Sequence, residues 1–173
     1  MRPVATPVER LADRFGDRVR VLPSLAGQAA VTLAPGDLPE VAAFLRGDLA
    51  FDLLLDLVGV DRLGHPDAPA PRFEVIYHLR SLAHGQRIRL HVPVPDETLE
   101  IPSLWRTWHA ANWLEREAWD LFGIRFAGHP NLRRILCHHR FEGHALRKDY
   151  PIQRRQRLDE PEEVLLTDDP EWA

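Results

Sequence analysis

The sequence has few of the features that define several common protein classes. Its 173 residues contain one cysteine, Cys137, so no disulfide bond can form within the chain, as is typical of a reducing compartment. No run approaches the ~20 apolar residues of a membrane-spanning helix, and the first residues lack the apolar core of a secretory signal. No glycine-rich phosphate loop supports nucleotide binding. We therefore expect a protein that is neither exported nor inserted into a membrane.

Lysine is almost absent as well, since Lys148 is the only lysine among 22 basic residues. Arginine, which can bind carboxylates in a bidentate manner, carries the remaining positive charge. Residues 125–157 hold nine basic and two acidic residues, a net charge of +7, whereas residues 158–173 hold seven acidic residues and no basic one. This pattern indicates docking on charged partners or folding of the acidic tail onto the basic segment, although two separately solvated stretches would look the same.

The distribution of apolar residues predicts one α+β domain. Composition is that of an ordinary soluble protein, with 45% hydrophobic and 28% charged residues. Helices are predicted at 6–15, where Thr6, Pro7 and Glu9 form a capping-box pattern, and at 37–47. The predicted strands lie at 18–22, 28–33, 51–60, 72–80 and 86–94. The expected fold class is therefore α+β, with a mixed or antiparallel sheet and helices packed on one face.

The longest predicted helix spans residues 103–122, with Ser103 as its N-cap. It places Glu115 on a stripe of aromatic side chains, where a carboxylate either reaches water at the margin or accepts hydrogen bonds from a later arginine. Arg116 and Asp120 are four residues apart and are expected to pair along the helix. The arginines that could bind Glu115 are Arg133, Arg134 and Arg147.

After the predicted helix, the periodic pattern is lost. Turn residues, arginines and aromatics follow one another with little predicted regular structure, which is typical of a functional or a disordered segment. Tyr150 and several apolar residues argue against disorder, so we expect this segment to lie ordered along a surface, and the sequence leaves open whether a partner must supply that surface. The chain is accordingly divided into a globular body at 1–122, an extended docking arm at 123–157 and an acidic tail at 158–173.

The same region resembles a known family. The matching motifs are Glu115-Arg116-Glu117-x-x-Asp120-Leu121-Phe122-Gly123-Ile124, Gly128-His129-Pro130, Arg133-Arg134-Ile135-Leu136 and Leu146-Arg147-Lys148-Asp149-Tyr150-Pro151. In this order they are similar to the 30 kDa subunit, also called the C subunit, of the proton-pumping NADH:quinone oxidoreductase, respiratory complex I. The resemblance covers roughly residues 50–151. It departs from the family pattern at 137–141 and at Ala145, where the family has an acidic, proline-containing turn and a proline.

The resemblance implies a non-catalytic, cofactor-free structural subunit of the hydrophilic arm of complex I, on the cytoplasmic face of the bacterial inner membrane. It implies docking chiefly on the D subunit, which helps form the quinone site, and contacts with the iron–sulfur B and I subunits. FMN, the iron–sulfur clusters and quinone would be bound by those partner subunits. The expected partner interface consists of Glu115, Arg116, Glu117, Asp120, His129, Arg133, Arg134, Arg147, Lys148, Asp149 and Tyr150.

Other kinds of site have weaker support in the sequence. Cys137 is surrounded by histidines of the type that bind metals, but a second cysteine and paired ligand spacing are both lacking. Cys137 and His138 make a poor nucleophile–base pair because adjacent side chains rarely point the same way. Three carboxylates on one helix are more often a solvated face than an acid/base pair. The candidate metal ligands are His129, Cys137, His138, His139 and His144, and the carboxylates are Glu115, Glu117 and Asp120.

Two functional alternatives stay open. One is the equivalent subunit of a related membrane-bound hydrogenase or of a ferredoxin- or F420-linked dehydrogenase. The other is a stand-alone binding domain. The basic segment with Phe141 and Tyr150 could bind nucleic acid, but the adjacent acidic tail and a pI near 6.1 disfavour it, so no nucleic-acid partner is expected.

Overall fold

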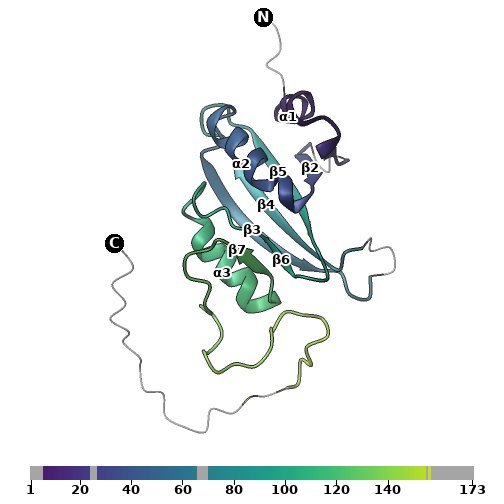
Figure 1. Cartoon of the computed structure of the whole chain (residues 1–173), viewed down its shortest axis with the longest axis vertical. Helices are drawn as coiled ribbons and strands as arrows, with labels where there is room; N and C mark the ends of the chain where they lie inside the picture. The colour runs from purple at the N-terminus through teal and green to yellow at the C-terminus, as the bar shows by residue number, and fades with distance from the viewer. Residues whose placement is uncertain (1–5, 24–26, 66–69, 155, 157–173) are drawn as a thin grey trace, which may run out of the picture.

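A five-stranded sheet forms the centre of the structure, a computed structural model that describes residues 6–23, 27–65, 70–154 and 156. The strand order is β1-β2-β5-β4-β3 (Figure 1). β2 pairs with β5 in parallel and all other neighbouring strands are antiparallel. Of the two predicted forms, mixed and antiparallel, the sheet is therefore the mixed one. The strands are β1 (Val19–Val21), β2 (Ala29–Leu33), β3 (Leu53–Asp61), β4 (Phe73–Arg80) and β5 (Arg87–Val94).

The predicted helices of the first half are confirmed. α1 (Pro7–Phe15) begins with the predicted capping box, in which the Thr6 hydroxyl accepts from the Glu9 N–H and the Glu9 carboxylate accepts from the Thr6 N–H. α2 (Leu38–Gly47) follows as predicted, although the Asp37 side chain does not cap it and instead pairs with Arg18. Short 3-10 turns, η1 (Gly16–Arg18) and η2 (Pro35–Asp37), precede β1 and α2.

The helices pack on one face of the sheet, as the fold prediction states. Along β4 every second side chain is buried, from Phe73 to Leu79, and these residues form one core with the inner face of α2. α3 (Ala111–Phe122) packs on the same face, because a Cβ on Gly59 of β3 would lie 2.7 Å from the Phe122 ring. Figure 1 shows α2 and α3 in front of the strands, and no helix of the described residues covers the opposite face of the sheet.

The prediction of one helix over 103–122 is wrong in its first half, because α3 begins only at Ala111. The preceding residues form strand β6 (Glu100–Pro102), which pairs in parallel with β7 (Arg125–Ala127), and then turns. The indole N–H of Trp105 donates to the Gly128 carbonyl, and that of Trp108 donates to the Phe51 carbonyl. The tryptophans matched a helical spacing, but these long-range hydrogen bonds hold them in a non-helical segment.

The arm that follows α3 contains β7 and then consecutive turns in its described part, which reaches Arg154. The acidic tail at 158–173 lies outside the described residues, so the predicted tail and the full extent of the arm stay predictions. None of the helices in the described part of the chain has the length and apolarity that crossing a bilayer requires.

Candidate partner interface

Gly123 ends α3 and turns the chain toward the arm. Its φ of 76° lies in the left-handed region, which glycine adopts without steric cost. A Cβ at this position would lie 2.4 Å from Nη2 of Arg147 and 2.6 Å from Nε2 of His144. The left-handed φ therefore favours glycine here, and a larger residue would also displace the ends of the Arg147 and His144 side chains.

The carboxylate of Asp120 fixes the arm to α3. Asp120 is fully buried, and its Oδ2 accepts the backbone N–H groups of Ile135, Leu136 and Cys137 at 3.1, 2.8 and 2.9 Å. Its Oδ1 accepts from Nη1 of Arg134 at 2.6 Å. Burial raises the pKa of this carboxyl, but the hydrogen bonds to the charged form outweigh burial and hold the pKa below its ordinary value. Asp120 is therefore ionised at neutral pH.

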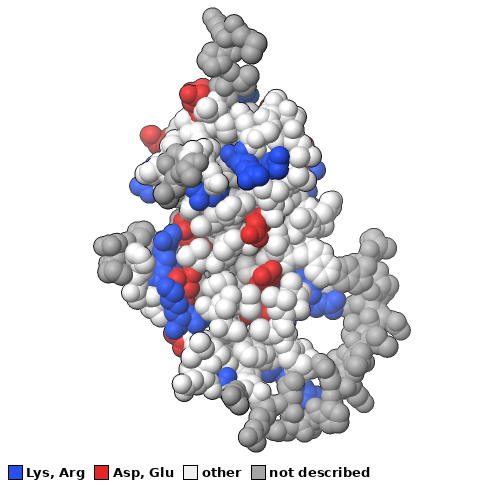
Figure 2. Space-filling model, turned by 180° about the vertical axis from the view of Figure 1, so that it is seen from behind, with Lys and Arg blue, Asp and Glu red and all other residues white. Residues whose placement is uncertain are grey.

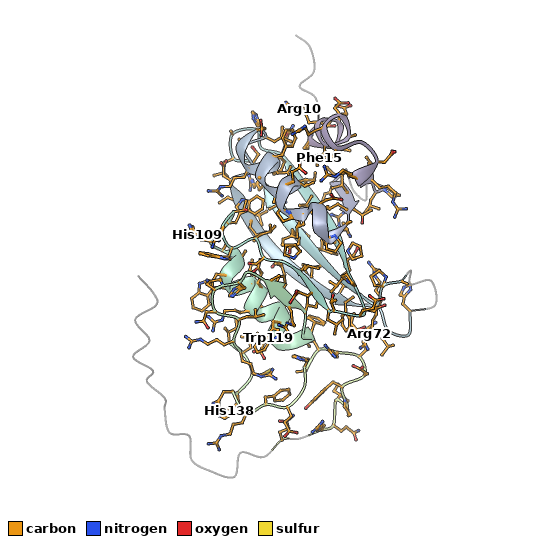
Figure 3. All side chains as sticks on the ribbon, in the orientation of Figure 1. Arg10, Phe15, Arg72, His109, Trp119 and His138 are labelled. Atoms are coloured by element: carbon orange, nitrogen blue, oxygen red, sulfur yellow. The ribbon has the colours of Figure 1, made fainter. Side chains whose placement is uncertain are left out.

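Arg134 extends the same network into the arm. Its Nη2 donates to the carbonyls of Phe141 and Gly143 at 2.8 and 2.9 Å, so one guanidinium joins α3 to two later turns. The guanidinium also lies 5.6 Å from the ring centroids of Trp119 and Phe141, at cation–π distance. Figure 3 shows Trp119 on α3, with the arm segment that carries His138 beyond it. Arg134 thus stabilises the fold of the arm itself.

Arg116 binds the arm, and the predicted pair with Asp120 is wrong. The Arg116 Nε donates to the Arg133 carbonyl at 3.1 Å, and its Nη2 donates to the Arg134 carbonyl at 3.3 Å. The guanidinium also lies 5.0 Å from the Trp113 ring. Because arm amides and Arg134 already bind both Asp120 oxygens, the four-residue spacing on the helix did not determine the partner.

Glu115 matches neither of its two predicted environments. The residue is fully buried, its Oε1 accepts the Leu104 N–H at 2.7 Å, and its Oε2 accepts the Ser103 hydroxyl. Ser103, predicted as a helix N-cap, is thus the partner of a buried carboxylate. Burial raises the pKa of Glu115 to about 7, because these two donors offset only part of the cost of burying its charge.

A second set of contacts joins the arm to the last turn of α3. Helix ends leave backbone carbonyls without intrahelical partners, and here the arm supplies the donors. The Leu146 N–H donates to the carbonyl of residue 121 at 3.0 Å, and Nε of Arg147 donates to that of residue 122 at 2.6 Å. Nδ1 of His144 lies 2.9 Å from the carbonyl of residue 120. Burial lowers the pKa of His144, so this ring is neutral and donates from Nδ1 at neutral pH.

A third contact joins the arm to the edge of the sheet. Arg72 donates to both carboxylate oxygens of Asp61 at 2.8 and 2.7 Å and to both of Asp149 at 2.9 Å. The Lys148 N–H also donates to Asp61, at 2.9 Å. The Arg72 guanidinium holds the pKa of Asp61 well below its ordinary value. Figure 3 shows Arg72 where the sheet meets the arm, and neither Asp61 nor Arg72 was predicted as a site residue.

The remaining predicted interface residues are dispersed around this network. Glu117 is exposed on α3, and the ring of His129 lies 3.0 Å from the Asn112 carbonyl. The Tyr150 ring packs against Phe141 with a centroid distance of 5.6 Å. No observation tests a partner contact for any of the eleven predicted residues, so that contact stays a prediction.

The other proposed chemistries gain no support from the geometry. Within the described residues, no group of three or more His, Cys, Asp or Glu side chains is arranged to hold a metal ion. Burial raises the pKa of the Cys137 thiol, which disfavours the thiolate that a nucleophile needs. His138 packs against His139, with ring centroids 4.2 Å apart.

The sequence of this chain matches a known protein family. The family described as "Respiratory-chain NADH dehydrogenase, 30 Kd subunit" matches residues 31–156. The chain belongs to this family. As a member of the 30 kDa subunit family, it is a subunit of the NADH–quinone oxidoreductase enzyme complex, as the sequence motifs predicted.

Individual relatives agree with this assignment. The C subunit of the NADH-quinone oxidoreductase of Acidithiobacillus ferrooxidans is 44% identical over 148 residues, which cover 83% of this chain and 73% of that protein. The same subunit of Geobacter metallireducens is 41% identical over 146 residues, which cover 84% and 88%.

Two solved structures share the fold of this 30 kDa family member. A trypsin-resistant fragment of Nqo5 has a TM-score of 0.68 at 35% identity, with 73% of this chain and 100% of the fragment covered. A chain of an archaeal membrane-bound sulfane sulfur reductase has a TM-score of 0.58 at 19% identity, covering 70% and 68%. The second likeness shows the fold alone.

The arm of this 30 kDa family member also exposes apolar side chains that the sequence analysis missed. The exposed fraction is 62% for Leu136, 54% for Leu146 and 99% for Ile152, and Trp113 on α3 is 51% exposed. They were missed because the charged motif residues beside them were expected to form the interface. The structure instead places several of those charges in contacts within the chain.

Proposed function

We propose that this chain is a non-catalytic, cofactor-free assembly subunit of the hydrophilic arm of complex I, and that it docks on the quinone-site D subunit through α3 and the arm. Contacts with the iron–sulfur B and I subunits and a position on the cytoplasmic face of the membrane are parts of the same proposal. FMN, the iron–sulfur clusters and quinone are bound by the partner subunits. This chain contributes a rigid surface to the complex in which electron transfer from NADH to quinone drives proton translocation.

One observation carries the proposal. Asp120, Arg134 and Arg147 use their hydrogen bonds to fold the arm onto α3, while Leu136 and Leu146 are left exposed. Apolar groups presented by an ordered surface are typical of the centre of a protein interface, where they lose contact with water on binding. The polar network therefore preorganises the arm, and the apolar side chains supply the contact area.

This division of roles refines the one expected from the sequence. There, Arg133, Arg134, Arg147 and Lys148 were expected to meet acidic groups of the partner, with Tyr150 as an aromatic anchor. The intrachain contacts of Arg134 and Arg147 favour a role in holding the arm in its binding conformation. Preorganisation of this kind strengthens binding because less conformational entropy is lost on association.

The proposal is tested by placing a charge on the apolar surface. In the double variant Leu136→Glu, Leu146→Glu, we expect recovery of the assembled complex from membranes to fall at least tenfold, since burying unpaired carboxylates in an interface is costly. Both side chains are exposed in the isolated chain, so its thermal unfolding midpoint should stay within a few degrees of wild type.

The matched control is Leu82→Glu, because Leu82 is 59% exposed in the β4–β5 turn, away from the arm. We expect normal recovery of the complex and normal NADH–quinone reductase activity in this variant. Normal assembly of the double variant would contradict the proposed docking surface. Turnover of NADH or quinone by the purified chain alone would contradict the non-catalytic role.

A further inference from the structure

The face of the sheet opposite the helices carries a basic surface that the proposed docking site does not use. The strand register places Thr32 beside His91, and His78 beside Arg89, with all four side chains on this face. Figure 2 shows the molecule from that side, with basic side chains in the upper part of the view and along its left margin, and acidic side chains in the centre and among the basic ones at that margin. α3 packs on the other face of the sheet (Figure 1).

A groove of about 460 Å³ is recessed into this face. Its floor comes from β2, β4 and β5, and Arg20 of β1 and Arg62, which follows β3, contribute to its sides. The side chains of Arg89 and His91 of β5 also line the groove. The groove therefore gathers three arginines from three separate parts of the sheet.

The positive charge of the groove exceeds the negative charge that it contains. Its acidic residue, Glu74, pairs with Arg62 and lies 3.2 Å from Nδ1 of His91. Burial raises the pKa of Glu74, but these two partners outweigh burial and lower it, so Glu74 is ionised and already bound. Among the described residues, no carboxylate pairs with Arg20 or Arg89, and Nε of Arg89 is buried without a hydrogen-bond partner. Two guanidinium groups are thus available to an external anion.

The spacing of the basic groups fits an extended polypeptide. Arg87, Arg89 and His91 lie at alternate positions of β5, so their Cα atoms repeat at about 6.8 Å along the strand. Carboxylates at alternate positions of an extended segment have the same repeat. Neighbouring Val58 and Ile76 add apolar surface beside the groove, which suits a protein segment better than a planar layer of lipid headgroups.

We propose that this groove is a second partner-binding surface, which takes an extended acidic segment of a neighbouring protein through Arg20 and Arg89. Carboxylate oxygens of the segment accept hydrogen bonds from the two guanidinium groups, and the apolar strip on β3 and β4 contacts its other side chains. The proposal goes beyond docking through the arm, because it uses the face of the sheet that is opposite α3 and a different kind of chemistry.

The test uses the full chain and a fluorescent peptide with six Glu-Thr repeats, measured by anisotropy at low and high salt. We expect binding that weakens with salt, and an at least tenfold loss of affinity in the double variant Arg20→Ala, Arg89→Ala. The matched control is Arg10→Ala, Arg14→Ala on α1, which removes the same charge from an exposed surface and should leave the affinity within twofold of wild type. Arg20→Glu, at an exposed position, replaces the double variant if Arg89→Ala prevents folding.

Several results would overturn the proposal. Unchanged affinity in the groove variant would do so, as would an equal loss in the α1 control, because either shows binding by net charge alone. Binding of phosphatidylglycerol vesicles, but not of the peptide, through Arg20 and Arg89 would assign the groove to a membrane surface. A tenfold gain in peptide affinity on removal of residues 158–173 would assign it to the acidic residues of this same chain.

Discussion

Two buried carboxylates on α3 behave in opposite ways. Glu115 and Asp120 lie five residues apart and are both fully buried, yet the pKa of Glu115 is raised to about 7 and that of Asp120 is lowered. Glu115 faces the segment before α3 and accepts hydrogen bonds from Ser103 and Leu104, with no cation among its partners in the described part of the chain. Asp120 faces the arm, where three backbone amides and Arg134 bind it.

The comparison shows that burial alone does not set the charge state of these groups. Burial raises the pKa of both carboxyls, and the number and charge of the donors decide whether that effect is overcome. Asp120 is a charged anchor for the turns of the arm. Glu115 lies near the buried Tyr77 hydroxyl, but that hydroxyl forms no hydrogen bond among the described residues, so Ser103 and Leu104 are left to offset the burial of Glu115.

The largest expected effect comes from Asp120→Ala. This change leaves the amides of residues 135–137 and the Arg134 guanidinium without their acceptor, so we expect unfolding free energy to fall by ~3–5 kcal/mol. Urea denaturation measures the loss, and limited trypsin digestion should show faster cleavage within the arm. Glu117→Ala, at an exposed site on the same helix, should change stability by less than ~0.5 kcal/mol. Equal stability of the two variants would show that Asp120 does not anchor the arm.

The next effect is a pH dependence that Glu115→Gln should remove. The folded pKa of about 7 lies above the ordinary 4.5, so the folded state retains a proton that the unfolded state has released. The contribution of this group is fully present below pH 4.5 and is lost as the pH rises toward 7, a loss on the order of 3 kcal/mol. Urea denaturation from pH 4 to 8 should therefore show the variant gaining stability relative to wild type over this interval.

The matched control for this titration is Glu117→Gln, an exposed carboxyl on the same helix. The Glu117→Gln variant should follow the wild-type pH profile of stability, because the change leaves the buried Glu115 carboxyl and its partners in place. A difference between Glu115→Gln and wild type that does not vary with pH would show that folding leaves the pKa of Glu115 unchanged.

Among the changes to buried or arm-binding side chains, the smallest effect on stability is expected from Arg147→Ala. The change removes the hydrogen bond to the Phe122 carbonyl and the contact with the Phe73 ring at 5.3 Å, but leaves no buried carboxylate unpaired. We expect a loss of ~1.5–3 kcal/mol with the sheet still folded, and lower recovery of the assembled complex because the arm is less ordered. Lys148→Ala should leave stability nearly unchanged, since only the Lys148 backbone contacts Asp61. Wild-type recovery of the complex with Arg147→Ala would show that docking does not depend on the order of the arm.

Local patterns predicted the parts of the fold that depend on near neighbours. The Thr6 capping box, the alternation along β4 and β5 and the loss of helical period after Gly123 are each set within a few residues, and each is confirmed. The family motifs in the arm were recognised for the same reason. Turn glycines and charged residues at fixed spacing are visible without knowledge of the tertiary structure.

Contacts between distant segments were not predictable from these patterns. Asp61 and the Lys148 N–H that it accepts are 87 residues apart, and no local spacing links them or Arg72 to the arm. The first half of the predicted long helix failed for the same reason. Trp105 and Trp108 fit a helical period, but their indole groups bind carbonyls of other segments.

The sequence by itself determined the helix caps, the strand alternation, the concentration of arginine after α3 and membership of the family. The tertiary structure alone decided which charges face one another and which charges are left for a partner. A charged side chain pairs with whichever donor or acceptor the folded backbone brings within hydrogen-bond distance. The number of residues between the two partners does not determine that distance. The charged form of Asp120 is thus stabilised by amides that lie fifteen or more residues later, while burial raises the pKa of Glu115, on the same helix, because its two described donors offset only part of that burial.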